Sequence, residues 1–163
     1  MNKLLRTVLP AVAAATSIEA AQTNLNGHVF TLPDGFTVEL VAAAPLVNRP
    51  ISIAFDERGR LYATDSSGSN EKGPTQYERK VHRIVRLEDT DGDGRFEKSV
   101  VFADKMMFPE GAMLYEGSLY VAAPPQIWKL TDTDGDGVAD KREVWHDGKT
   151  LTGCANDLHG PYL

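Results

Sequence analysis

Two stretches of the chain decide its fold: HRIVRLEDTDGDGRFEKSVVFAD at residues 82–104 and PQIWKLTDTDGDGVADKREVWHD at residues 125–147. Equivalent positions lie 43 residues apart, so that Phe102 in the first stretch corresponds to Trp145 in the second. A fixed period of this size is typical of proteins built from repeated structural units. We therefore interpret the chain as a repeat protein.

A second similarity precedes the first and completes each unit. SIAFDERGRLYATD at 52–65 and GAMLYEGSLYVAAP at 111–124 share a Leu-Tyr pair after a polar, glycine-containing turn. The apolar runs are short, alternate with polar residues, are rich in Val, Ile, Phe, Tyr and Trp, and are bounded by Gly, Asp and Pro, which predicts β-strands. No sustained helical pattern follows the first residues. The expected strands are 50–55, 60–65, 81–88 and 98–103 in one unit, and 109–115, 118–123, 126–131 and 141–146 in the next.

Repeats of 40–50 residues with four strands each describe the blades of a β-propeller. We expect an all-β fold, a β-propeller of four-stranded antiparallel blades. Because a propeller closes with at least four blades, residues 22–163 are expected to be the N-terminal part of a truncated propeller domain. It would hold two blades and, from NDLHGPYL at 156–163, the start of a third. The alternative is a complete, small antiparallel β-sandwich.

The first residues predict a signal peptide. MNKLLR carries two basic residues, a short apolar run follows, and SIEAAQ supplies small residues for cleavage, so residues 1–21 are expected to direct export. The mature protein would be periplasmic or exposed at the cell surface. The alternative is an apolar N-terminus on a cytosolic protein.

Composition excludes several classes of function. The 163 residues carry 23 acidic and 17 basic side chains and a net charge of -6, which disfavours nucleic acid as a partner. No run reaches the roughly 20 apolar residues of a membrane-spanning helix, so the sequence does not indicate membrane association. Cys154 is the only cysteine, and the chain therefore lacks both an internal disulfide and a haem-attachment motif.

The two acidic loops are candidate Ca²⁺ sites. The second loop matches a twelve-position Ca²⁺ loop, with oxygens at positions 1, 3, 5, 9 and 12 and glycine at position 6. The first lacks an acidic residue at position 12, so Glu97 would have to replace it and the site is expected to be weaker. The alternative is a solvated Asp-Gly turn. Candidate ligands are Asp132, Asp134, Asp136, the Val138 carbonyl, Asp140 and Glu143 in the second loop, and Asp89, Asp91, Asp93, Arg95 and Glu97 in the first.

The longer connections are expected at the opposite end of the strands. In an antiparallel meander the acidic loops share one end with the tight turns, whereas residues 66–80, 104–109 and 147–155 lie at the other, where functional loops are common. His159 is the candidate catalytic base there, although a lone histidine is more often a packing residue. Other polar candidates on that side are Asp65, Arg49, Lys105, Glu110, Asn156 and Asp157.

The segments at 32–65 and 84–104, with their Leu-Pro-x-Gly-Phe, Phe-Asp-x-x-Gly-Arg-Leu-Tyr and paired DTDGDG motifs, carry a family resemblance. Over residues 30–163 the chain resembles the N-terminal region of large exported proteins of planctomycetes and verrucomicrobia described as membrane-bound dehydrogenases. That family is similar to soluble quinoprotein dehydrogenases of sugars and sorbosone, which are β-propellers that use pyrroloquinoline quinone (PQQ) and Ca²⁺. NDLHGPYL, which contains His159, is similar to the segment where those enzymes place a catalytic histidine, without matching it cleanly.

The resemblance implies a function in redox chemistry. We expect the N-terminal part of a quinone-dependent sugar or alcohol dehydrogenase that passes electrons to a c-type cytochrome, with haem c confined to a C-terminal part outside this sequence. In this hypothesis His159 takes the substrate hydroxyl proton while hydride moves to the quinone. The alternatives are a non-catalytic, Ca²⁺-stabilised propeller that binds carbohydrate or protein partners, and an adhesion repeat that uses its acidic loops for Ca²⁺ alone.

Overall fold

The computed structural model describes residues 21–151 and 158–162. The expected signal peptide, apart from Ala21, lies outside the described residues, as do Cys154, Asn156 and Asp157. The chain divides into two compact units, one that ends at Leu40 and one that begins at Val41. Within the described residues, no helix has the length and apolar character needed to cross a membrane.

The first unit contains a β-hairpin that was not predicted. Strands β1 (Ala21–Leu25) and β2 (His28–Leu32) pair antiparallel around a two-residue turn. Asn26 and Gly27 both have positive φ angles, 51° and 79°, which is the backbone that a two-residue hairpin turn requires and that Asn-Gly adopts most readily. The dipeptide was therefore the signal in the sequence for this element.

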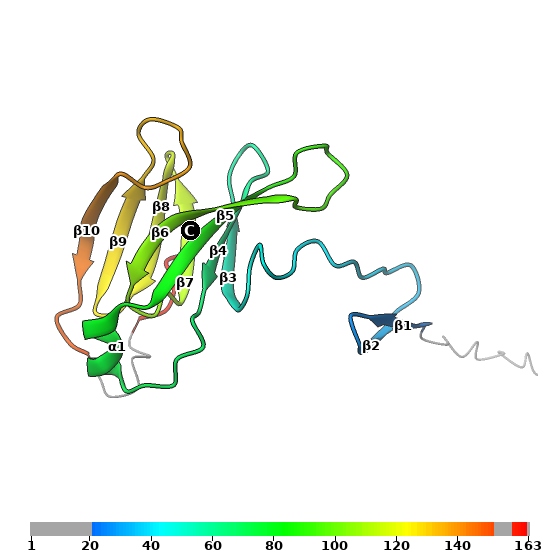
Figure 1. Cartoon of the computed structure of the whole chain (residues 1–163), viewed down its shortest axis with the longest axis horizontal. Coiled ribbons are helices and arrows are strands. Elements are labelled where there is room, and N and C mark those ends of the chain that lie inside the picture. Colours follow the sequence, from blue (N-terminus) through cyan, green and yellow to red (C-terminus); the bar gives the residue numbers. More distant parts are fainter. Residues whose placement is uncertain (1–20, 152–157, 163) are drawn as a thin grey trace, which may run out of the picture. The chain divides into compact units, whose positions relative to one another are not determined.

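The second unit contains two antiparallel sheets of four strands each, in the order of the chain. The first sheet consists of β3 (Pro50–Phe55), β4 (Leu61–Asp65), β5 (His82–Glu88) and β6 (Lys98–Met106). The second consists of β7 (Gly111–Tyr115), β8 (Ser118–Ala123), β9 (Gln126–Thr131) and β10 (Lys141–Asp147). The predicted pair of four-stranded antiparallel units is confirmed, and the described residues show no closed propeller. Figure 1 shows the two meanders.

A short helix corrects the prediction of a chain without helices after its first residues. Helix α1 (Gly73–Arg79) lies in the connection between β4 and β5. Proline in its first turn presets the helical φ angle, and Lys80 ends the helix with φ 46° and an N–H bond to the Gln76 carbonyl. With seven residues the helix is too short to show a helical apolar period.

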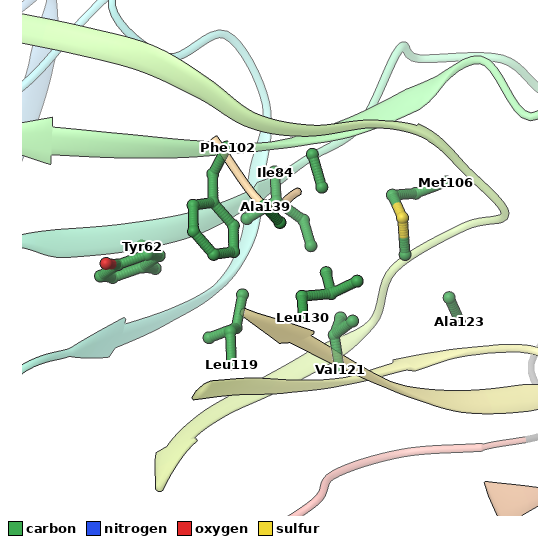
Figure 2. Close-up of a cluster of buried hydrophobic side chains, with 10 residues drawn as sticks. Tyr62, Ile84, Phe102, Met106, Leu119, Val121, Ala123, Leu130 and Ala139 are labelled. Carbon is green, nitrogen blue, oxygen red and sulfur yellow. The ribbon is translucent and has the colours of Figure 1, made fainter. Parts of the chain in front are cut away.

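The main core lies between the two sheets. Tyr62 and Phe102 of the first sheet meet edge to face, with ring centroids 5.0 Å apart, and pack toward the second sheet (Figure 2). Phe102 is the extra residue of a β-bulge, because Val85 pairs with Val101 while Ile84 pairs with Ala103. The bulge turns the Phe102 ring toward the second sheet. The buried residues opposite include Leu119, Val121 and Leu130.

The other face of the first sheet has its own cover. Leu61, Ala63, Val85 and Leu87 are buried there under Val47, with Ala42, Leu46 and Phe96 packed around them. The backbone N–H of Phe96 also donates to the Val41 carbonyl, 2.9 Å away. Residues 41–47 thus cover β4 and β5 on this face. Ile53 and Phe55 on β3 stay more than half exposed.

The segment at the end of the chain does not form the expected strand in its described part. Residues 158–162 have no regular secondary structure. They lie close to the start of β7, since a Cβ added to Gly111 would stand 2.1 Å from the Gly160 carbonyl oxygen. Glycine at position 111 is therefore required by this contact.

Candidate functional site

The two acidic loops lie at the same end of the second unit. The loop of residues 89–97 connects β5 to β6, and the loop of residues 132–140 connects β9 to β10. Both lie at the end opposite to α1 (Figure 1). As the antiparallel meander predicts, the acidic loops therefore lie at the opposite end from the long connection that contains α1.

The first loop gathers four carboxylates. Ligand oxygens of Asp89, Asp91, Asp93 and Glu97 all lie within 4.8 Å of one another. Asp89 accepts hydrogen bonds from the backbone N–H groups of Gly92 and Gly94 at 2.7 and 2.8 Å, and the bond from Gly94 is the main cause that lowers the Asp89 pKa. Asp89 is thus held as a carboxylate that faces the loop interior.

The second loop gathers three carboxylates, those of Asp132, Asp134 and Asp136. Asp132 accepts from Gly135 and Gly137 at 2.7 and 2.9 Å, which are the positions that correspond to Gly92 and Gly94. Asp140 does not join this group. It caps the loop by accepting hydrogen bonds from the Thr133 N–H and hydroxyl, as Glu97 does with Thr90 in the first loop.

The twelfth position of the second loop does not supply the bidentate ligand that the pattern predicts. Glu143 is the third residue of β10, opposite Lys129 on β9, and forms an ion pair with Lys141 at 3.0 Å. The structure therefore does not bring Glu143 to the other carboxylates. At position 7, the N–H groups of Val138 and Arg95 donate to Asp136 and Asp93.

The donor set of the first loop fits a hard divalent cation. Ca²⁺ binds six to eight oxygens at 2.3–2.6 Å, so two ligands on opposite sides of the ion are about 5 Å apart. Carboxylate oxygens within 4.8 Å of one another satisfy this limit. Each carboxylate has about four lone-pair positions, and the hydrogen bonds within the loop leave some of them for a metal. The acidic clusters of both loops can therefore hold an ion such as Ca²⁺.

Arg86 distinguishes the second loop from the first. Its side chain is 5% exposed and extends from β5 across to the other sheet, where one guanidinium nitrogen lies 3.3 Å from Asp132 Oδ2. The other nitrogen contacts Glu88 at 2.6 Å. Gly137 lies directly against this guanidinium. A buried cation thus already compensates part of the negative charge of the second loop.

His159 and Glu110 are brought together at the end of the second unit opposite to the acidic loops. His159 Nδ1 lies 3.1 Å from Glu110 Oε2, with the histidine side chain 61% exposed and the glutamate 6% exposed. Asp65 has a structural environment instead. It is buried, accepts hydrogen bonds from the backbone N–H groups of Asn48 and Arg49, and pairs with Arg83. Lys105 lines a separate cavity with Lys80 and Trp128.

His82 is a buried polar group whose environment the sequence did not indicate. The Ser67 N–H donates to Nδ1 at 3.0 Å, so the ring proton lies on Nε2, which donates to Gln76 Oε1 at 2.7 Å. Burial lowers the pKa of His82. The neutral imidazole thereby joins β5 to helix α1 and to the segment before it.

The fold and the loops define a class of β-rich repeat protein, with two four-stranded antiparallel sheets that each carry an acidic loop able to hold a cation. A family model described as a domain of unknown function, DUF7133, matches residues 23–160. The chain belongs to the DUF7133 family. A search of the curated proteins finds no match. The family match covers most of the hairpin and both sheets and names no activity.

Proposed function

We propose that this chain forms two neighbouring blades of a β-propeller whose acidic loops bind Ca²⁺ as structural clips. The observation that carries the proposal is the convergence of Asp89, Asp91, Asp93 and Glu97 in a loop that joins two adjacent strands. Uncompensated carboxylates this close repel one another, and a bound divalent cation converts that repulsion into attraction. The ion would fix the ends of β5 and β6.

Calorimetric titration of the whole chain with Ca²⁺ tests the proposal. We expect binding in the wild type, with Asp91→Asn removing most of the heat from the first loop and Asp134→Asn weakening the second. Asp34→Asn is the matched control, because Asp34 is exposed and lies outside both loops. The absence of Ca²⁺ binding at millimolar concentration, or equal titration curves for all four proteins, would refute the proposal.

A quinone-dependent dehydrogenase is the second candidate, and the Glu110–His159 pair favours it. A carboxylate that contacts one imidazole nitrogen orients the ring, as a general base requires. The candidate substrate is a sugar or alcohol, and the electron acceptor a c-type cytochrome. Because the His159 side chain is 61% exposed, the described residues do not enclose a quinone around it. Support for PQQ therefore comes from the resemblance alone.

Dye reduction tests the redox candidate. The protein is supplied with PQQ and Ca²⁺ and assayed against a panel of sugars and alcohols, with His159→Ala compared with His146→Ala, an exposed histidine on β10. We expect only His159→Ala to abolish turnover. No activity across the panel, or equal activity of both variants, would leave the non-catalytic Ca²⁺-binding role.

A further inference from the structure

The second sheet has an aromatic face that points away from the first sheet. Trp145 is 60% exposed and Tyr115 is 44% exposed. Together with Met113, Tyr120, Pro161 and Tyr162 they line a cavity of about 310 Å³. We call this surface the outer face of the second sheet. Exposed apolar patches of this kind mark interaction surfaces.

The outer face repeats the buried contact surface of the first sheet. Tyr120 follows the same Leu-Tyr motif as Tyr62, and Trp145 lies 43 residues after Phe102. Tyr62 and Phe102 meet at 5.0 Å and 88°; Tyr120 and Trp145 meet at 5.6 Å and 87°. The pair is thus buried on the first sheet, whereas on the second sheet its tyrosine is half-buried and its tryptophan is exposed.

A β-bulge at the same repeat position underlies this equivalence. Trp145 is the extra residue between Val144, which pairs with Trp128, and His146, which pairs with Ile127. Phe102 is the extra residue of the corresponding bulge on β6. A β-bulge redirects a side chain but interrupts the regular pairing of the strands. Because the bulge on β10 turns Trp145 outward, we interpret this face as a contact surface.

The first sheet shows what such a surface contacts. Tyr62 and Phe102 pack in one cluster with Leu119, Val121 and Leu130 of the second sheet, while the Phe102 carbonyl accepts the Ala139 N–H of the acidic loop at 2.8 Å. Arg86 adds an ion pair to that loop through Asp132. The face that carries Tyr62 and Phe102 therefore contacts a sheet that presents a row of aliphatic side chains and an acidic loop.

The outer face also carries a basic residue at the same repeat position as the first sheet. Lys129 occupies the position that corresponds to Arg86, and its ammonium group lies 5.8 Å from the Tyr120 ring centroid. A lysine there can pair with an acidic loop residue that corresponds to Asp132. The apolar pair and the cation are thus arranged in the second sheet as they are in the first.

We propose that the outer face of the second sheet is the docking surface for a further four-stranded unit of this same repeat. A second copy of the chain does not fit, because residues 41–47 already cover Leu61, Ala63 and Leu87, which correspond to Leu119, Val121 and Leu130. Phe96 also donates to Val41 as Ala139 donates to Phe102. The inference rests on the blade arrangement proposed above and is independent of Ca²⁺ binding.

A tandem duplication of residues 109–151 within the whole chain tests the proposal. The inserted unit supplies an aliphatic row and an acidic loop to the outer face of the original one. In the duplicated protein, Trp145→Ala in the original unit is expected to lower the melting temperature by roughly 10 °C, as loss of a buried aromatic ring does. The same substitution in the last unit is expected to change it little, since that face stays open.

The unduplicated chain provides the controls. Phe102→Ala is expected to lower its melting temperature strongly and Trp145→Ala only slightly, and sedimentation is expected to show a monomer. Equal effects of Trp145→Ala in the two units, a duplicated unit that does not fold cooperatively, or a dimer that Trp145→Ala dissociates would each overturn the proposal. Repeating the measurements in EDTA tests docking without bound Ca²⁺. A failure of the docking proposal is thereby distinguished from a failure of Ca²⁺ binding.

Discussion

At the residue scale, Arg86 decides how the two acidic loops differ. The twelve-position pattern favours the second loop because of Glu143, but in the structure Glu143 pairs with Lys141 and Arg86 lies 3.3 Å from Asp132. The first loop has one more carboxylate in its cluster. On the proposal that both loops bind Ca²⁺, we therefore expect the first loop to be the tighter site, the reverse of the order expected from the pattern.

Replacing Arg86 tests this interpretation directly. In an Asp91→Asn background, which leaves the second loop as the main site, Arg86→Met is expected to strengthen Ca²⁺ binding by about tenfold, because it removes a cation beside Asp132. Calorimetry measures the affinity, and circular dichroism checks that the variant is folded. Arg79→Met, at an exposed position on α1 and at the end opposite to the acidic loops, serves as the control. Weaker binding in a folded Arg86→Met protein would contradict the prediction.

His82 predicts a pH dependence of stability in a defined window. Burial lowers its pKa in the folded protein, whereas in the unfolded chain it titrates near 6.5. Below about pH 6.5 the unfolded chain therefore binds a proton that the fold excludes, so the free energy of unfolding falls with decreasing pH. Above that value the contribution is fully present and constant.

Denaturant unfolding between pH 8 and pH 5 measures this dependence. We expect the wild type to lose stability below pH 6.5 and His82→Asn to show a flatter profile. His146→Asn, at an exposed position, is expected to keep the wild-type slope. The protection factors for hydrogen exchange at residues 66–80, which take out the pH dependence of the intrinsic rate, should fall in the same window. Identical slopes for the wild type and His82→Asn would rule out His82 as the titrating group.

The chemistry of the candidate ligands was predictable, but their full set was not. Alternate aspartates with intervening glycines predict a turn that gathers carboxylates, and the first three aspartates of each loop do converge. Position 12 of the pattern belongs to loops that continue into a helix. Here β10 follows the second loop, and a strand carries its third residue away from the loop. Sequence spacing alone does not contain that difference.

At the element scale, Gly137 and Gly94 form a natural pair for comparison. Both have positive φ angles, 98° and 90°, so alanine is strained at either position. A Cβ at Gly94 would meet nothing within 4 Å, whereas one at Gly137 would stand 2.4 Å from an Arg86 nitrogen. Arg86 is held by Glu88 and Asp132 and cannot move without losing those bonds.

Alanine at these two glycines should therefore have unequal effects. Gly94→Ala is expected to cost about 1 kcal/mol for backbone strain, and Gly137→Ala about 1–3 kcal/mol more because it also displaces a buried arginine. Urea denaturation in EDTA measures both without interference from metal. Equal losses would mean that Arg86 adapts to the added methyl group.

The strands were predictable and the smaller elements were not. Period-two alternation and β-branched residues placed all eight strands of the two sheets within a few residues of their bounds. Helix α1 escaped prediction because its stability comes from tertiary contacts, such as the Gln76 bond to His82, and not from its own apolar pattern. The bulges at Phe102 and Trp145 likewise depend on pairing between strands.

At the scale of the whole molecule, the charge is unevenly distributed. Residues 88–97 hold five acidic side chains and one basic, and residues 131–143 hold five acidic and two basic. These two segments account for more negative charge than the net -6 of the chain, so the rest is close to neutral. Without a cation, the repulsion within these segments opposes folding.

Stability should therefore depend on salt in a way that Ca²⁺ reverses. In EDTA, raising NaCl from 10 mM to 0.5 M is expected to raise the melting temperature, because the screening length falls from about 30 Å to a few ångströms and like charges in each loop repel less. With millimolar Ca²⁺ the protein should already be stabilised, by an amount set by the ratio of free ion to dissociation constant, and added NaCl should have little effect or lower the melting temperature. An Asp91→Asn, Asp134→Asn double variant should respond weakly to both. If NaCl lowers the melting temperature of the wild type in EDTA, loop repulsion is not the dominant electrostatic contribution to its stability.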